Sequence, residues 1–217
     1  MSDGLLASAI AACARALAGP SVRWVGCAPE PDQRVYFANH TSHLDFVVLW
    51  SVLPWNLRAL TRPVAAKDYW SSGLRKAIAV NAFHAVLVER GANTGETDRA
   101  MAARTTLEVL LDALGTENSL IIFPEGTRGS GLEVAPFKSG IYYLWLKRQD
   151  VQFVPVYLAN LNRILPKGEF LPVPAARVRV LKGDERITAE EVGEWSSTIS
   201  YEVLTSIGPR VERRYSE

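Results

Sequence analysis

The chain has 217 residues, which is enough for one large domain or two small ones. Its composition, 48% hydrophobic and 22% charged residues, excludes a disordered protein. A net charge of +1 gives no bulk electrostatic attraction to nucleic acid, so no nucleic-acid partner is expected. The two cysteines, Cys13 and Cys27, form neither a disulfide framework nor a metal motif, which indicates a reducing compartment and no metal site.

The first predicted element is a helix at residues 4–18. The segment is apolar but contains Arg15, and it is too short to span a bilayer. An interfacial helix and a core helix both fit its pattern. Because no repeat or linker interrupts the rest of the chain, we predict two units: residues 1–20 as an amphipathic, membrane-associating helix, and residues 21–217 as a single domain.

Strands and helices alternate along the remaining sequence. Apolar or extended runs predict strands at residues 34–39, 58–67, 84–90, 119–124, 151–158 and 176–183. Periodic segments predict helices at residues 46–53, 68–80, 94–115, 138–149 and 188–207, followed by a solvated tail at 210–217. This alternation predicts an α/β fold with a mixed, largely parallel central sheet flanked by helices, preceded by the N-terminal amphipathic helix.

Polar side chains gather at residues 39–45, Asn-His-Thr-Ser-His-Leu-Asp, between a predicted strand and an apolar helix. His40 and Asp45 are five residues apart, about 140° around a regular helix, so they meet only if His40 lies in the preceding loop. We expect the helix to begin at Thr41 or Ser42, with Ser42 and Asp45 as a capping box. An ionised carboxylate there would orient the imidazole, and simple helix capping is the alternative for Asp45.

A second polar stretch follows the predicted strand at 119–124 and reads Glu-Gly-Thr-Arg. Gly126 lets the backbone approach a ligand, and the planar guanidinium of Arg128 suits phosphate. An ordinary turn with a surface ion pair between Glu125 and Arg128 fits the same residues. Arg90 lies just past another predicted strand, where binding groups of α/β folds gather, although a solvated arginine is equally compatible.

The order and spacing of these stretches resemble the PlsC-like glycerolipid acyltransferase family. Its first motif, Asn-His-x4-Asp, is matched by Asn39, His40 and Asp45. Its third, Phe-Pro-Glu-Gly-Thr-Arg, is matched without change at residues 123–128 and is followed by Phe-Lys-x-Gly at 137–140. Together these two motifs are highly specific for the family.

The other motifs of the family are matched less closely. Arg90 fits the end of the second motif, whose usual upstream glycine is replaced in this sequence. Residues 154–156 match the apolar-Pro-apolar fourth motif, and Lys67 lies in a segment similar to the lysine segment between the first two motifs. The resemblance covers roughly residues 34–183.

The resemblance implies transfer of a fatty acyl group from acyl-CoA or acyl-carrier protein to a lysolipid, by default 1-acyl-glycerol-3-phosphate, in phospholipid biosynthesis and without a cofactor. His40 would act as general base on the acceptor hydroxyl, while Asp45 would orient the imidazole and offset its charge. The substrate-binding residues that the resemblance implies are Lys67, Arg90, Glu125, Gly126, Thr127 and Arg128. Their basic members would face the phosphate of the acceptor.

A membrane surface is the implied partner because the substrates are lipids. Residues 50–76 carry four aromatic and five basic residues with a single acid, a mixture that suits the headgroup region of an anionic leaflet. The four aromatic residues are Trp50, Trp55, Tyr69 and Trp70. We therefore expect a peripheral or monotopic enzyme on the cytoplasmic face of the membrane, anchored by residues 4–18 and 46–76; a core helix followed by a solvated basic face is the alternative.

Several alternatives stay open. Another lysolipid, such as a lyso-ornithine lipid or a lysophospholipid, could be the acceptor. Ser42 beside His40 leaves room for a serine hydrolase or esterase, although the sequence has no Gly-x-Ser-x-Gly elbow. A non-catalytic membrane-binding module could keep the same fold. His43 is expected to be a packed or surface histidine rather than a second catalytic residue.

Overall fold

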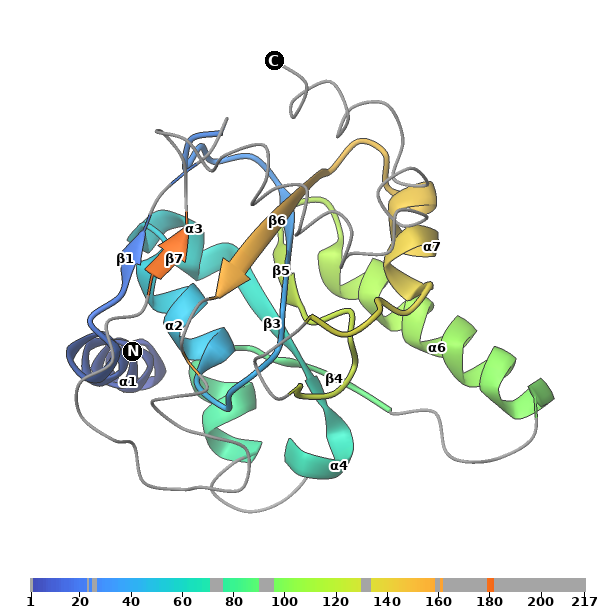
Figure 1. The fold of residues 1–217 in the computed structure, drawn as a ribbon, viewed down its shortest axis with the longest axis horizontal. Coiled ribbons are helices and arrows are strands. Elements are labelled where there is room, and N and C mark those ends of the chain that lie inside the picture. The colour runs from blue at the N-terminus through green and yellow to red at the C-terminus, as the bar shows by residue number, and fades with distance from the viewer. Residues whose placement is uncertain are drawn as a thin grey trace.

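A seven-stranded sheet forms the centre of the molecule (Figure 1). The structure, a computed structural model, describes residues 2–22, 24, 27–70, 76–89, 96–129, 134–158, 161 and 179–181. In spatial order the strands are β1 (Ser21–Val22), β7 (Arg179–Leu181), β6 (Gln152–Leu158), β2 (Arg34–Ala38), β5 (Ser119–Ile122), β3 (Thr61–Ala66) and β4 (Val86–Val88). Neighbouring strands are parallel except β6 and β7. The predicted mixed, largely parallel sheet is confirmed.

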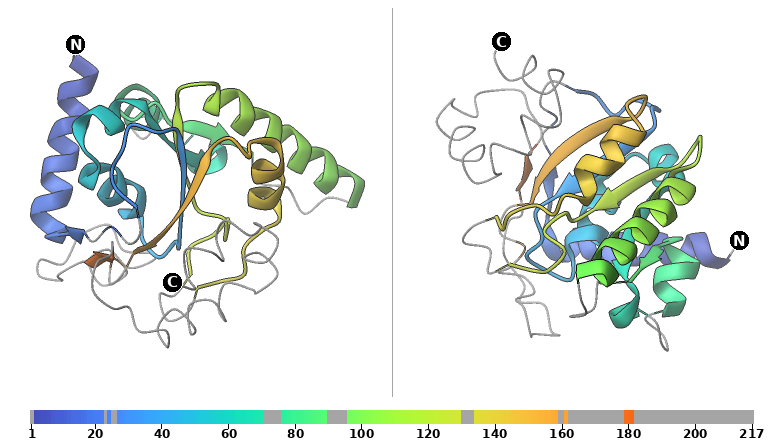
Figure 2. Two further views of the ribbon diagram at one scale, coloured as in Figure 1. Left: turned by 90° about the horizontal axis from the view of Figure 1, so that it is seen from above. Right: turned by 90° about the vertical axis from the view of Figure 1, so that its right-hand side faces the viewer.

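Helices cover both faces of this sheet (Figure 2). They are α1 (Ser2–Ala18), α2 (Asp45–Val52), α3 (Trp55–Leu60), α4 (Lys67–Trp70), α6 (Glu96–Leu114) and α7 (Gly140–Lys147), with a π-helical turn η1 (Ile78–Ala82). Helices α1 and α2 share one hydrophobic cluster with the sheet, and α6 and α7 share the other. The result is a three-layer arrangement of helices, sheet and helices.

Strand β2 shows why the sheet is covered twice. All five of its residues are buried. Tyr36 and Ala38 belong to the cluster under α1 and α2, whereas Val35 and Phe37 belong to the cluster under α6 and α7. Successive side chains of a strand point to opposite faces, so a strand buried on both faces must be apolar at nearly every position.

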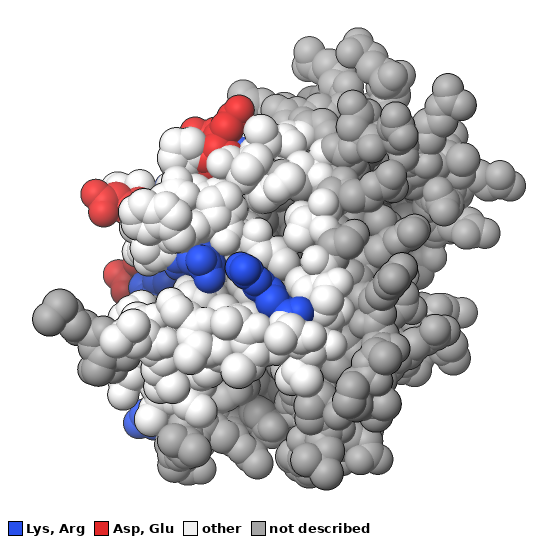
Figure 3. All heavy atoms as spheres, turned by 90° about the vertical axis from the view of Figure 1, so that its left-hand side faces the viewer, with Lys and Arg blue, Asp and Glu red and all other residues white. Residues whose placement is uncertain are grey.

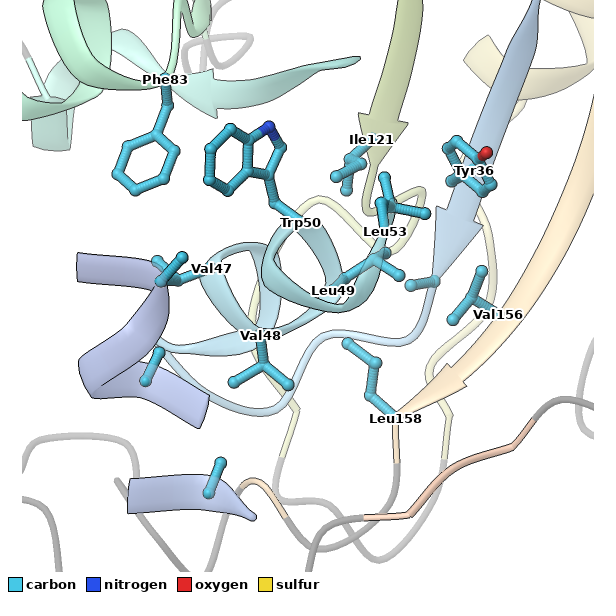
Figure 4. Packing of buried hydrophobic residues seen from close by; sticks show 14 of the residues in the cluster. Tyr36, Val47, Val48, Leu49, Trp50, Leu53, Phe83, Ile121, Val156 and Leu158 are labelled. Carbon is cyan, nitrogen blue, oxygen red and sulfur yellow. The ribbon is translucent and has the colours of Figure 1, made fainter. Parts of the chain in front are cut away.

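Helix α2 lies between α1 and the sheet and brings aromatic and aliphatic side chains into the core (Figure 4). Trp50 is only 7% exposed, and its ring meets Phe83 edge-on with 5.1 Å between centroids. Its indole N–H donates to the carbonyl oxygens of Arg58 and Thr61. The expectation that Trp50 belongs to a surface aromatic group is therefore wrong, because the indole packs inward and its N–H is satisfied at the junction of α3 and β3.

The same stretch does present one large exposed aromatic side chain, Trp55, which is 78% exposed at the start of α3. Trp70 is half-buried and meets Phe46 edge-on. The side chain of Tyr69 lies outside the described part of the chain. The expected aromatic surface is thus reduced to Trp55 among the side chains that can be placed.

Helix α1 confirms the predicted N-terminal helix and packs through its smallest residues. Ala7, Ala11, Ala14 and Ala18 are buried at a spacing of three or four residues, which is one face of a helix. Small side chains let the backbones of α1 and α2 approach closely. Leu5 and Leu6 point outward, at 74% and 47% exposure. No helix within the described residues is long and apolar enough to cross a membrane.

Some element boundaries differ from the predictions. Residues 58–60 complete helix α3 instead of beginning the predicted strand, which starts at Thr61. The segment 68–80 divides between α4 and η1 instead of forming one helix. Helix α6 ends as predicted before Gly115, whose φ of +49° suits a residue without a side chain. The helix predicted at 188–207 and the tail lie outside the described residues.

Candidate active site

His40 and Asp45 meet at the carboxyl end of β2. His40 lies in the loop between β2 and α2, and its Nδ1 is 2.8 Å from Asp45 Oδ2. Asp45 is the first residue of α2 and is completely buried, whereas 22% of the His40 side chain is exposed. As expected, the side chains of His40 and Asp45 meet because His40 lies in the loop before the helix. A partly exposed imidazole against a buried carboxylate can exchange a proton with a bound molecule.

The Asp45 carboxylate also holds the backbone of the loop. Its Oδ2 accepts the backbone N–H of Thr41 at 2.6 Å and of Ser42 at 2.8 Å. A carboxylate can only accept, so the neutral His40 ring carries its proton on Nδ1 and leaves a lone pair on Nε2. Asp45 Oδ1 is buried and, among the described atoms, has no hydrogen-bond partner. The buried carboxylate therefore keeps its second oxygen beside the imidazole without another described partner.

The start of α2 differs from the predicted capping box. The helix begins at Asp45, not at Thr41 or Ser42, and its N-cap residue Leu44 makes no side-chain cap. Asp45 does reach back to the N–H of Ser42, which is one half of a capping box. The Ser42 hydroxyl, however, accepts the N–H of Leu44 at 3.2 Å. The carboxylate therefore binds the loop ahead of the helix, and Ser42 does not cap the helix as expected.

Glu125 supports the same loop from the neighbouring strand. It follows β5, which pairs with β2, and only 4% of the residue is exposed. Its Oε1 accepts the backbone N–H of His40 at 2.6 Å, and its Oε2 accepts that of Ala135 at 3.1 Å. Burial raises the pKa of the Glu125 carboxyl, although these two N–H groups and the His40 side chain act in the opposite direction. Both oxygens of Glu125 thus hold the backbone of the site.

The raised pKa of Glu125 gives a testable dependence of stability on pH. Its pKa is ordinarily 4.5, so the folded state binds this proton more tightly than the unfolded state. The resulting stabilisation is complete below the ordinary value and is lost as pH rises through the raised one. We expect the free energy of unfolding of the native protein, minus that of Glu125→Gln, to fall as pH rises above the ordinary pKa of 4.5 in urea titrations. A difference that grows with pH would contradict this, and Glu117→Gln at an exposed turn is the control.

Gly126 makes the turn after Glu125 possible. Its φ is +71°, and a Cβ at this position would lie 2.5 Å from Nζ and 2.7 Å from Cε of Lys138. The backbone N–H of Lys138 donates to the carbonyl of Pro124 at 2.9 Å, which fixes the start of the lysine beside the turn. The positive φ is what favours glycine here, because the flexible end of Lys138 could move away from a Cβ. The ammonium group of Lys138 lies over the backbone of this turn.

The turn also packs against His40 itself. The Phe123 ring stacks on the imidazole with 4.3 Å between centroids and 23° between planes. The N–H of Gly129 donates to the carbonyl of His40 at 2.8 Å. The polar stretch at residues 39–45 and the one that follows β5 are thus joined through His40, by a contact to its ring and a hydrogen bond to its backbone.

Arg128 contacts His43, a pair that the sequence interpretation did not foresee. Nη1 of Arg128 bonds to Nε2 of His43, and both side chains are half-buried. Since arginine has no acceptor, His43 accepts this bond through Nε2. His43 is therefore not an isolated surface histidine. The contact between His43 and Arg128 could have been suspected from the sequence, because His43 lies in the same loop as His40 and Arg128 lies in the second polar stretch.

The other implied substrate-binding residues lie further along the sheet edge. Lys67 follows β3, and its Nζ is 2.8 Å from Oε1 of Glu89, which follows the paired strand β4. This hydrogen bond and the charge of Lys67 lower the pKa of the Glu89 carboxyl. Both side chains are mostly exposed, so the pair adds little stability. Thr127 is exposed, and Arg90 lies outside the described residues, so its role stays a prediction.

The acidic and basic groups of the site do not form a metal centre. Over the ranges that the structure describes, no group of three or more His, Cys, Asp or Glu side chains could hold a metal ion. The fold and site define an α/β protein with a histidine–carboxylate pair at the carboxyl edge of a largely parallel sheet, where ligands of such folds bind.

The family follows from comparison with known proteins. Residues 27–159 match the family model described as Acyltransferase, which is more than half of the chain. The chain belongs to this family, as its motifs indicated.

Two similar proteins carry related names. The chain is 27% identical over 184 residues to "1-acyl-sn-glycerol-3-phosphate acyltransferase alpha" of Mus musculus, covering 82% of this chain and 59% of the mouse protein. The chain thus spans about three fifths of that relative. The crystal structure of the 1-acyl-sn-glycerophosphate (LPA) acyltransferase PlsC from Thermotoga maritima superposes with a TM-score of 0.59 at 19% identity, covering 97% of this chain and 79% of that one. At this identity the likeness shows the fold.

The C-terminal part of the sequence is similar to a different family. Residues 172–215 match the model for the alanine racemase C-terminal domain. A 33-residue stretch is 54% identical to the alanine racemase of Thermodesulfovibrio yellowstonii, covering 15% of this chain and 9% of that protein. Apart from 179–181, residues 172–215 lie outside the part of the chain that the structure describes.

Proposed function

We propose that this chain is an acyltransferase that moves a fatty acyl group from acyl-CoA or acyl-carrier protein to the free hydroxyl of 1-acyl-glycerol-3-phosphate. The observation that carries the proposal is the 2.8 Å contact between His40 Nδ1 and the buried Asp45, in a chain of the Acyltransferase family. The names of the mouse and Thermotoga maritima proteins support the choice of acceptor.

The reaction is a direct transfer in which His40 acts as the base. Its Nε2 takes the proton of the acceptor hydroxyl, and the oxygen attacks the carbonyl carbon of the thioester. As the carbon–sulfur bond breaks, the proton on His40 passes to the leaving thiolate. Asp45 keeps the proton on Nδ1 of the neutral ring and stabilises the imidazolium that forms between the two transfers. A base of this kind contributes about two to four orders of magnitude in rate.

Binding of the acceptor phosphate falls to the basic side chains around this pair. Arg128 is oriented by His43, and Lys138 lies over the turn at Gly126. Lys67 stands at the same carboxyl edge of the sheet, two strands from β2, where a phosphate would compete with Glu89 for its ammonium group. Arg90 is assigned to this group by its match to the second motif alone.

The location that we propose is the cytoplasmic face of a membrane, with the chain bound peripherally or monotopically. The outward leucines of α1, Leu5 and Leu6, and the exposed Trp55 of α3 support this. The division into an N-terminal helix at residues 1–20 and one domain at 21–217 stays a prediction.

The test is a transfer assay with labelled acyl-CoA and acyl-carrier protein against a panel of lysolipids. We expect the highest kcat/KM with 1-acyl-glycerol-3-phosphate, and a higher KM for this acceptor in Arg128→Gln. Turnover confined to a lyso-ornithine lipid or to an acceptor without phosphate would replace the proposed acceptor and remove the role of Arg128. Hydrolysis with a trapped acyl-serine at Ser42 would instead establish the serine hydrolase alternative.

A further inference from the structure

Two arginines converge on the far end of α2 from the active site. Arg15, in the last turn of α1, donates from Nη1 to the carbonyl of Ser51 at 3.3 Å. The guanidinium of Arg58 on α3 lies over the ring of Trp50, 5.3 Å from its centroid. Trp50 and Ser51 are neighbours near the end of α2, whereas Asp45 begins it, so roughly one and a half helical turns separate the arginines from the catalytic pair.

Within the described part of the chain, no carboxylate pairs with either of these cations. Nε of Arg58 is buried and has no hydrogen-bond partner among the described residues. Burial and then the charge of Arg15 lower the pKa of the Arg58 guanidinium. Like charges held together with an unsatisfied donor are unfavourable unless an anion binds between them.

An open groove beside Arg15 has room for such an anion, and Arg58 is not among the residues that line it. Its volume is about 430 Å³. It is lined by Arg15, Gly19, Pro20, Val22 and Val52. Among the described residues, Figure 3 shows basic atoms in the middle of this side of the molecule and acidic atoms towards its margin. The groove therefore offers a positive centre to a small anion approaching from solvent.

Exposed hydrophobic side chains occur at the groove and on the helices α1 and α3. Val22 lines the groove and is 36% exposed. Leu17 on α1 is 39% exposed, and Trp55 and Leu60 on α3 are 78% and 42% exposed. Exposed hydrophobic side chains would not contribute to binding a soluble anion. They would contribute to binding a lipid phosphate, because tryptophan and leucine are stabilised in the headgroup region of the membrane.

We propose that Arg15 and Arg58 form a binding site for the phosphate of an anionic membrane lipid, distinct from the acceptor site at His40. The forked guanidinium groups would hold the phosphate oxygens, and the exposed hydrophobic side chains would enter the interface. The site deepens the membrane association of the proposed function and rests on it, but it does not require any particular acceptor lysolipid.

The test is co-sedimentation of the full chain with vesicles of phosphatidylcholine alone or with phosphatidylglycerol added. We expect Arg15→Gln and Arg58→Gln each to weaken binding to the anionic vesicles about fivefold, and to leave binding to phosphatidylcholine unchanged. High salt should remove the difference, because exposed charges are screened. Arg104→Gln is the matched control: Arg104 is 83% exposed on α6, on the opposite side of the molecule from α1 (Figure 1).

Three results would overturn the proposal. Equal losses in Arg104→Gln would show a non-specific charge effect, and unchanged binding in Arg15→Gln would show that the site is not used. Competition by glycerol 3-phosphate at millimolar concentration would identify a site for a soluble phosphate. If Arg58→Gln fails to fold, the result for Arg15→Gln is the test. This variant is expected to fold, because Arg15 contributes a single hydrogen bond, to the carbonyl of Ser51. Transfer activity in uncharged detergent micelles should be unchanged in Arg15→Gln, which separates this proposal from the proposed reaction.

Discussion

Replacement of His40 by alanine should lower kcat for acyl transfer by about two to four orders of magnitude, because no other group in contact with Asp45 can accept the hydroxyl proton. The KM values for donor and acceptor should change little, since the imidazole acts in the transition state. The measurement is steady-state transfer with labelled acyl donor at saturating acceptor.

The fold should survive this change because His40 is held mainly through its backbone. Its N–H donates to Glu125, and its carbonyl accepts from Gly129, and neither bond needs the ring. A thermal unfolding midpoint near that of the native protein is the check. His84→Asn is the matched histidine control: His84 is exposed with a φ of +50°, which asparagine tolerates. Activity that persists in His40→Ala at native levels would end the general-base mechanism.

Replacement of Asp45 by asparagine should cost about as much in kcat as loss of the base, for a different reason. The amide oxygen can still accept the N–H groups of Thr41 and Ser42, so the loop can keep its shape. The negative charge that stabilises the imidazolium is lost, and the proton position on His40 is no longer dictated. The value of kcat should therefore fall while the thermal unfolding midpoint stays near that of the native protein, which a merely structural change would not produce.

Asp45→Ala and Ser42→Ala complete this comparison. Alanine at position 45 leaves two backbone N–H groups at buried positions without their acceptor, at a cost of about 1–3 kcal/mol each, so it should lower the melting temperature as well. Ser42→Ala removes a hydroxyl that accepts from the N–H of Leu44 and should keep near-native transfer. If Ser42→Ala were inactive while folded, nucleophilic catalysis by the serine would have to replace direct transfer.

The sequence was sufficient for those features that local pattern determines. The apolar runs of β2 and β5 predicted strands, and Asn-His-x4-Asp predicted a histidine in the loop before a helix. The exact start of α2 was not predictable, because Ser42 and Asp45 can both accept backbone N–H groups near the start of the helix. In the structure the Asp45 carboxylate accepts from Thr41 and Ser42, the Ser42 hydroxyl accepts from Leu44, and the helix begins at Asp45.

Contacts between distant parts of the chain were the least predictable features of the site. Glu125 was expected to line a pocket, yet its oxygens bind backbone N–H groups of His40 and Ala135, a role that depends on β5 lying next to β2. The bond between His43 and Arg128 joins residues 85 positions apart in the sequence. Neither strand order nor side-chain direction in a loop follows from periodicity, so both had to come from the structure.

The alanine face of α1 also affects how membrane binding can be studied in this protein. Removing the helix would uncover Val47 and Val48, which are 6% and 0% exposed, at about 1.5–3 kcal/mol each. Both residues are on α2 within one turn of Asp45, so a truncated chain should lose the proposed transfer through disturbance of the loop at His40, whether or not it binds a membrane. Polar substitutions at Leu5 and Leu6, on the outer side of α1, leave that packing intact. They are the changes that separate attachment from catalysis.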